Sequence, residues 1–143
     1  MNTNTKAQLT IDSRLEEVPR ACDWLTRLAG QAGFTSKAIG DLQLVLTEAI
    51  GNVVHHSYDG EPGHPIVMSL STDEKALTLT VRDFGHPPDL SRYQLPALSE
   101  LSEGNYKAFL IHSLTDEVRY DISSEGAAIL TLVKRRKGSS EET

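Results

Sequence analysis

The chain has 143 residues, a formal net charge of -6 and a single cysteine, Cys22. That length fits one globular domain with its own core, while one cysteine excludes an intramolecular disulfide and the acidic balance argues against a broad nucleic-acid-binding surface. No segment approaches the roughly 20 consecutive apolar residues of a membrane span, so we expect a cytoplasmic protein in a reducing compartment that contacts neither nucleic acid nor membrane.

The first part of the chain predicts one strand and two helices. Residues 6–12 alternate apolar and polar side chains, which favours a strand. Residues 14–32 repeat apolar side chains at helical spacing, and Pro19 falls early enough to be tolerated in a first turn. A second helix is expected from Ser36, a candidate N-cap, to about Ser57. The apolar stripe of this helix consists of Leu42, Leu46, Ala49, Ile50 and Val53.

The remaining chain predicts two strand pairs, separated by an irregular segment and a short helix. Residues 58–65 are rich in turn-forming residues, and a hairpin should follow around the connection at residues 71–76. The irregular segment is a long loop over 84–104, and a long loop in a compact domain is usually functional or disordered. After it we expect a helix over 105–114 and strands over 117–122 and 127–135, which a turn at 123–126 joins.

This order of elements predicts an α+β fold. Because most of the expected strands come as hairpins, the five-stranded sheet should be mostly antiparallel, and three helices must cover one of its faces. The result is a two-layer α/β sandwich, expected to be a single domain over residues 1–143 with its core at about 6–135 and a polar tail over 136–143. The basic run at 134–137 is interpreted as a solvated strand exit rather than a binding patch.

The second expected helix carries polar residues beside its apolar stripe. Glu48 and Asn52 are four residues apart, as are Asn52 and His56, so the three side chains should stack on one helix face. The amide oxygen of Asn52 can ligate a hard cation such as Mg²⁺, and the Glu48 carboxylate can accept a proton or orient a hydroxyl. The alternative is a solvated helix edge with one hydrogen-bonded pair.

A second candidate residue lies at the end of a strand. The period of two that points Leu79 and Val81 inward also points Asp83 inward. A buried carboxylate needs partners, and Gly85 just after it lets another part of the backbone approach closely. Asp83 is therefore a candidate ligand-binding residue. The alternative is that it caps a turn, which is common in D-x-G segments.

A third candidate is the start of the helix expected over 105–114. Gly104 precedes it, and Asn105 would be its first residue. Backbone N–H groups at a helix N-terminus attract anions such as phosphate. A simple turn or a helix cap explains one glycine equally well.

In combination, these motifs resemble the GHKL or Bergerat ATPase superfamily, and within it the anti-sigma-factor serine kinases of bacterial partner-switching systems. The resemblance covers about residues 6–135, and the order and spacing of the motifs make it specific. LVLTEAIGNVVHHSY (44–58) resembles the N-box, VRDFGHPPD (81–89) the G1 box, and GNYKAFLIHSLTDEVRYD (104–121) the second glycine box with the helix and strand that follow it.

The resemblance implies a Bergerat-like ATP-binding domain with ATP and Mg²⁺ as cofactors. Asp83 matches the aspartate that contacts the adenine amino group, and Gly85 matches the glycine of that motif. Asn52 matches the asparagine that binds Mg²⁺ together with ATP. Glu48 matches the catalytic glutamate that orients the acceptor hydroxyl or takes its proton. The H-x-Y that ends the N-box matches His56 and Tyr58.

The second glycine box implies a phosphate site around Gly104, Asn105 and Lys107. The family pattern G-G-x-G-L reads G-N-Y-K-A in this chain, so only its first glycine is present. Asn105 adopts left-handed backbone conformations more readily than most residues, and Lys107 would add a positive charge for phosphate.

The implied function is a serine/threonine protein kinase that regulates transcription as an anti-sigma factor. It would transfer phosphate from Mg·ATP to a serine or threonine of an antagonist protein, bind a sigma factor, and form a homodimer. Because the glycine box is reduced, the alternative is a non-catalytic protein-binding regulator on the same fold. A fragment of a histidine kinase is a third interpretation, which the short chain disfavours.

Overall fold

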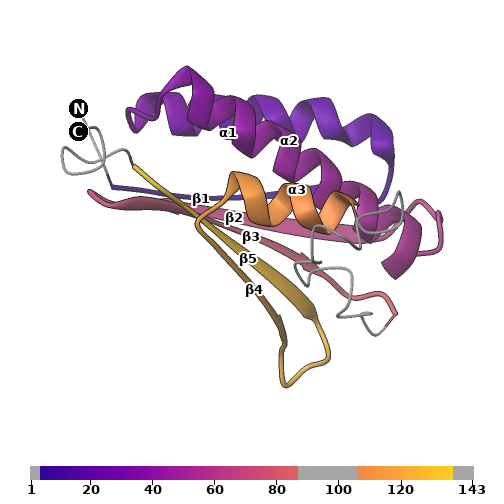
Figure 1. The fold of residues 1–143 in the computed structure, drawn as a ribbon. Helices are drawn as coiled ribbons and strands as arrows, with labels where there is room; N and C mark the ends of the chain where they lie inside the picture. The colour runs from indigo at the N-terminus through magenta and orange to yellow at the C-terminus, as the bar shows by residue number, and fades with distance from the viewer. Residues whose placement is uncertain (1–3, 87–105, 137–143) are drawn as a thin grey trace.

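The computed structural model describes residues 4–86 and 106–136. Within these residues, the helices and strands follow the order that the sequence predicts (Figure 1). The elements are β1 (Thr5–Asp12), a 3-10 turn (Leu15–Glu17), α1 (Val18–Gln31), α2 (Ser36–Asn52), a π-helical turn (Val53–Ser57), β2 (Pro65–Thr72), β3 (Ala76–Asp83), α3 (Tyr106–Leu114), β4 (Glu117–Ile122) and β5 (Ala128–Arg135).

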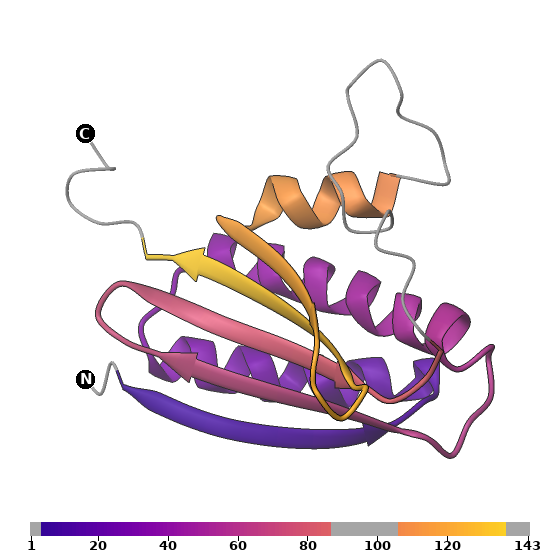
Figure 2. The same cartoon turned by 90° about the horizontal axis from the view of Figure 1, so that it is seen from below.

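The strands form one sheet with the order β1-β2-β3-β5-β4. Every neighbouring pair is antiparallel, including β1–β2 and β3–β5, which are not joined as hairpins. The helices lie together on one face of this sheet (Figure 1), and the view from below shows the strands in front of them (Figure 2). The α+β two-layer sandwich is therefore confirmed, and the described sheet is antiparallel throughout rather than only for the most part.

The core lies between the helical layer and the sheet. Alternate residues of β2 and β3 point into it, as their period of two predicts, and the apolar stripe of α2 packs against them. Removing this apolar surface from water is the main force that holds the layers together. Within residues 4–86 and 106–136, no helix combines the length and apolarity needed to cross a bilayer. The largest fully buried side chains are Ile11, Leu25, Leu42, Leu46, Ile50, Ile66, Met68, Leu70, Leu77, Leu79, Ile111 and Leu132.

The N-cap of α2 is Thr35, so the prediction of Ser36 at this position was wrong. Thr35 has an extended backbone and its hydroxyl accepts a hydrogen bond from the N–H of Ala38 at 3.1 Å, whereas Ser36 is the first helical residue. Both residue types cap helices well, and the backbone conformation decides between them. Pro19 lies in the first turn of α1, as predicted.

The expected second helix is interrupted after Asn52. The α-helix ends there, and residues 53–57 form a π-helical turn in which the N–H of Tyr58 donates to the carbonyl of Val53 at 3.0 Å. Asn52 is buried, whereas His56 is exposed. The polar stripe predicted for this helix therefore reaches the interior at Asn52 and does not continue inward to His56. A π turn inside a helix often marks a functional site.

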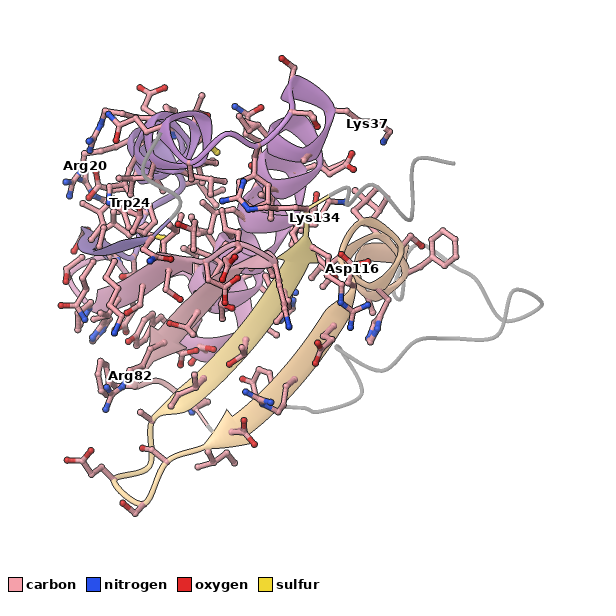
Figure 3. All side chains as sticks on the ribbon, turned by 90° about the vertical axis from the view of Figure 1, so that its left-hand side faces the viewer. Arg20, Trp24, Lys37, Arg82, Asp116 and Lys134 are labelled. Atoms are coloured by element: carbon pink, nitrogen blue, oxygen red, sulfur yellow. The ribbon has the colours of Figure 1, made fainter. Side chains whose placement is uncertain are left out.

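Lys134 and Arg136 of the basic run at 134–137 are built into the fold, so the interpretation of the run as a solvated strand exit was wrong for these two residues; Arg135 is exposed, and Lys137 lies outside the described residues. Lys134 lies between α2 and the end of α3 (Figure 3), where its ammonium group donates to the Asp41 carboxylate at 3.1 Å and to the Leu114 carbonyl at 2.7 Å. Arg136 donates to the Ala32 carbonyl at 2.6 Å and stacks over the Phe34 ring at 4.3 Å. These contacts join the helical layer to the sheet.

The ion pair between Asp41 and Lys134 is largely shielded from water, with both side chains only 18% exposed. Burial alone would raise the pKa of Asp41, but hydrogen bonds from Lys134 and Lys37 hold that pKa below its ordinary value. A carboxyl with a lowered pKa stabilises the fold at pH values above its unfolded pKa of about 3.9, and this contribution is lost as the pH falls through the folded pKa.

Replacing Lys134 with alanine should lower the free energy of unfolding by about 2 kcal/mol at pH 7, because it leaves Asp41 and the Leu114 carbonyl without their shared donor. The difference from the parent protein should shrink as the pH falls below 4. Urea denaturation from pH 3 to pH 7 measures both effects. Arg135→Ala is the matched control, since Arg135 is exposed and its loss should cost less than about 0.5 kcal/mol. Equal losses for the two variants would contradict this account.

Candidate functional site

The predicted site residues Glu48, Asn52, Asp83 and Gly85 lie at or near the ends of α2 and β3. Asn52 is the last residue of α2 and is 6% exposed, and Glu48 lies one turn earlier on the same helix in a half-buried position. Asp83 is the last residue of β3. The π-helical turn after Asn52 contacts the residues after Asp83 directly, so the ends of these two elements meet at one place.

Asp83 points into the protein, as strand alternation predicts. It is only 2% exposed, and one carboxylate oxygen accepts a hydrogen bond from the N–H of Gly85 at 3.0 Å. Burial raises the pKa of Asp83, and hydrogen bonds from Gly85 and from the Ser57 hydroxyl partly oppose this rise. The turn-capping contact is thus present. It uses one of the roughly four acceptor positions that two carboxylate oxygens offer.

Gly85 is required by close packing against the π-helical turn. A Cβ atom at this position would lie 2.1 Å from the backbone oxygen of Ser57, far inside any van der Waals contact. The same oxygen accepts a hydrogen bond from the N–H of His86 at 2.8 Å. The close approach that the sequence predicts at Gly85 is confirmed, and its partner is the backbone of Ser57.

Tyr58 completes this contact from the other side. Its hydroxyl donates to the Pro65 carbonyl at 2.7 Å and accepts from the N–H of Phe84 at 2.8 Å. Burial raises the pKa of Tyr58, so the phenol stays protonated at neutral pH and keeps its donor. Ser57 and Tyr58 together hold residues 83–86 through side-chain and backbone contacts.

Sequence reasoning missed Ser57 altogether and reached Tyr58 only through family resemblance. A serine followed by a tyrosine at the end of a helix is unremarkable in any sequence. The contact of the Ser57 backbone with Gly85 and His86 depends on the i→i+5 turn and on strand packing, so no sequence signal identifies it.

Of the residues predicted to bind phosphate, the structure describes the backbone of Lys107 alone. Gly104 and Asn105 lie outside the described residues. Lys107 belongs to the first turn of α3, which begins at Tyr106, one residue later than predicted. The Lys107 side chain lies outside the described part of the structure.

Asn52 is the described residue that the sequence predicts as a ligand for magnesium. Across residues 4–86 and 106–136, no group of three or more His, Cys, Asp or Glu side chains could hold a metal ion. An amide oxygen such as that of Asn52 is a suitable ligand for Mg²⁺, which usually keeps waters and takes most of its other ligands from substrate phosphates.

Comparison with known proteins matches nearly the whole chain. The family model described as "Histidine kinase-like ATPase domain" matches residues 11–134. The serine-protein kinase RsbW of Listeria innocua is 31% identical over 135 residues, which cover 87% of this chain and 84% of that protein. The serine-protein kinase RsbW of Oceanobacillus iheyensis is 27% identical over 120 residues, which cover 78% of this chain and 76% of that protein.

Two solved structures share the fold. The structure of the RsbU and RsbW domains of a Mycobacterium tuberculosis protein superposes with a TM-score of 0.66 at 19% identity, over 92% of this chain and 32% of that one. The histidine kinase domain of a blue-light-activated protein from Erythrobacter litoralis gives a TM-score of 0.55 at 15% identity, over 90% of this chain and 62% of that one. At these identities the likeness concerns the fold alone.

Proposed function

The chain belongs to the histidine kinase-like ATPase domain family, with relatives named serine-protein kinase RsbW, and from this premise we propose that it is an ATP-dependent serine/threonine protein kinase. In this proposal it acts as an anti-sigma factor that binds a sigma factor and phosphorylates an antagonist protein. The observation that carries the proposal is the buried carboxylate of Asp83, which accepts a hydrogen bond from the Gly85 N–H where the chain after β3 meets the turn that follows α2.

Each site residue has a role in this proposal. Asp83 accepts a hydrogen bond from the amino group of adenine, which suits a buried carboxylate with acceptor positions to spare. Asn52 ligates Mg²⁺, which neutralises charge on the phosphates when it is bound. Glu48 orients the acceptor hydroxyl of the antagonist protein. Gly104, Asn105 and Lys107, which match the glycine box by resemblance, bind the phosphates.

The transfer step needs little covalent chemistry from the protein. The oxygen of the acceptor hydroxyl forms a bond to the γ-phosphorus, and the bond from that phosphorus to the β–γ bridging oxygen breaks. ADP leaves with the electron pair of the broken bond, and the hydroxyl proton passes to the Glu48 carboxylate. Positioning and charge neutralisation supply most of the rate in such a step.

A non-catalytic protein-binding regulator is the second candidate, because only Gly104 of the family's glycine box is present. Nucleotide binding separates the two candidates. At a Mg·ATP concentration 100 times Kd, binding should stabilise the protein by about 2.7 kcal/mol, which for a chain of this size raises Tm by roughly 6–10 °C. Calorimetric melting with MgCl₂ alone is the control. An unchanged Tm at millimolar Mg·ATP would favour the non-catalytic regulator.

Glu48→Gln should lower the rate of phosphate transfer at least about 100-fold while leaving Mg·ATP affinity within about twofold, because a glutamine keeps the size of the side chain and cannot accept the proton. The rate is measured with γ-labelled ATP and the antagonist protein of the same organism as acceptor. Glu74→Gln, in the exposed turn between β2 and β3, is the matched control and should transfer at the parent rate. A Glu48→Gln variant with full activity would remove Glu48 from the catalytic step.

A further inference from the structure

The sheet opens between β2 and β3 beside the residue proposed to recognise adenine. The antiparallel register of these two strands ends at the pair Val67 and Arg82, one residue before Asp83. Each strand stays paired on its other side, β2 with β1 as far as Pro65 and β3 with β5 as far as Asp83. If the register of β2 and β3 continued, Pro65 would lie opposite Phe84, but a proline has no N–H for a further ladder bond.

The Tyr58 hydroxyl fills this opening. It donates to the Pro65 carbonyl at 2.7 Å and accepts from the N–H of Phe84 at 2.8 Å. One hydroxyl, from the residue that follows the π-helical turn, therefore connects the two strand ends where their own pairing has stopped.

The Tyr58 side chain is itself held from several sides. The residue is only 6% exposed, and its ring stacks on the His64 ring with the centroids 4.7 Å apart and the planes 15° from parallel. Its backbone N–H donates to the Val53 carbonyl at 3.0 Å, and its carbonyl accepts from the N–H of Glu61 at 2.9 Å. The hydroxyl is thus a fixed point to which the chain after β3 is attached.

We infer that Tyr58 is a positioning residue whose hydroxyl holds the chain from Asp83 to Gly85 so that the Asp83 carboxylate faces the adenine amino group. The carboxylate accepts from the N–H of Gly85 at 3.0 Å, and Phe84, which Tyr58 binds, lies between these two residues. Without the hydroxyl this segment can rotate, and a hydrogen bond weakens steeply as its angle departs from linear. The contact with adenine rests on the proposed ATP-binding function, whereas the control of Asp83 by Tyr58 concerns the nucleotide-free protein.

Two nucleotides that differ only in the amino group test the contact with adenine. ATP carries this group, and purine riboside triphosphate lacks it. Tyr58→Phe keeps the ring that stacks on His64 and removes only the hydroxyl. Isothermal titration in MgCl₂ should show ATP affinity about tenfold lower in this variant, with the affinity for purine riboside triphosphate within about twofold of the parent value. A general loosening of the site would weaken both nucleotides alike.

Ser13→Ala is the matched control, because it also removes a buried hydroxyl that bonds one carbonyl and one N–H. Ser13 is 1% exposed, and its hydroxyl donates to the Glu61 carbonyl at 2.6 Å and accepts from the N–H of His64 at 3.1 Å. Both contacts are with the loop before β2, and neither is with residues 83–86. Urea denaturation should show both variants to be less stable than the parent. Only Tyr58→Phe should change ATP affinity.

A second measurement needs no nucleotide. Amide hydrogen exchange, followed by NMR, should be at least about tenfold faster at Gly85 in Tyr58→Phe than in Ser13→Ala. The acceptor of the Gly85 N–H is the Asp83 carboxylate, which neither substitution removes. Faster exchange at Gly85 therefore reports that the carboxylate has lost its position.

The outcomes distinguish a failure of the proposed function from a failure of the role given to Tyr58. If the parent protein binds neither nucleotide, the proposed function and the adenine contact fall together, and exchange at Gly85 alone decides whether Tyr58 positions Asp83. If the parent binds ATP but Tyr58→Phe weakens both nucleotides equally or neither of them, or if Gly85 exchanges at the same rate in both variants, Tyr58 has only a structural role and the inference is overturned.

Discussion

Asp83→Asn is expected to weaken Mg·ATP binding about 100-fold and to raise the free energy of unfolding of the nucleotide-free protein at neutral pH. The first effect follows because the asparagine replaces a charged acceptor with a group that presents a donor toward the adenine amino group. Loss of a hydrogen bond to a charged group costs about 1.5–3 kcal/mol, and the facing donors add to that cost.

The second effect follows from the raised pKa of Asp83, whose largest cause is burial. A carboxyl whose folded pKa lies above its unfolded pKa stabilises the fold below the unfolded value of about 3.9, and this contribution is lost as the pH rises through the folded pKa. At pH 7 the parent protein therefore carries a buried charge that the asparagine variant lacks. The stability advantage of the variant should grow between pH 4 and pH 7.

Titration calorimetry with Mg·ATP and urea denaturation from pH 4 to pH 8 measure the two effects. Asp121→Asn is the matched control, because Asp121 is an exposed aspartate on β4 and its replacement should change neither property. Unchanged ATP affinity in Asp83→Asn would remove Asp83 from the adenine site. A pH-independent difference in stability would mean that the folded protein does not hold Asp83 as a buried charge.

Gly85→Ala is expected to lower the free energy of unfolding by about 3 kcal/mol, because its Cβ would lie 2.1 Å from the Ser57 backbone oxygen. Backbone cannot rotate away as a flexible side chain can, so either residues 83–86 or the π-helical turn must move. Both movements displace the Asp83 carboxylate, and Mg·ATP affinity should fall together with stability.

Gly40→Ala provides the comparison for this substitution. Gly40 lies inside α2, and nothing approaches within 4 Å of a Cβ built there. The same chemical change should therefore raise stability by about 0.5–1 kcal/mol, because alanine is the better helix former. Urea denaturation of the two variants measures the contrast. If Gly85→Ala proved as stable as Gly40→Ala, the close contact between Gly85 and Ser57 would not exist in solution.

The amino-acid sequence alone predicted the layers of the fold and part of the site. The alternation in β2 and β3 predicted which side chains are buried, and it placed Asp83 on the inner face without knowledge of any contact. The 3.6-residue repeat of apolar residues likewise predicted which side of α2 is buried, and it placed Asn52 at the edge of the core. These predictions succeeded because the periods of strands and helices are local properties, and burial of one face follows directly from them.

The side-chain chemistry of two neighbouring residues could not show which of them caps α2. Thr35 and Ser36 are both good N-caps, and only the backbone dihedral angles show that Thr35 takes the role. A continuous helix was also the natural expectation through residue 57, because no residue in that segment breaks helices. The structure has a π-helical turn there instead, and the backbone of this turn packs against Gly85 in the chain after β3.

Contacts between distant parts of the chain were decided by the tertiary structure. The Lys134 ammonium reaches Asp41, and the Arg136 guanidinium reaches the Ala32 carbonyl, although a basic run near a chain end looks solvated in the sequence. The sequence by itself thus determined the α+β sandwich and the inward carboxylate of Asp83. The tertiary structure alone brought the Ser57 backbone onto Gly85 and His86, because contacts between residues so far apart exist only once the helix end and the strand end have packed together.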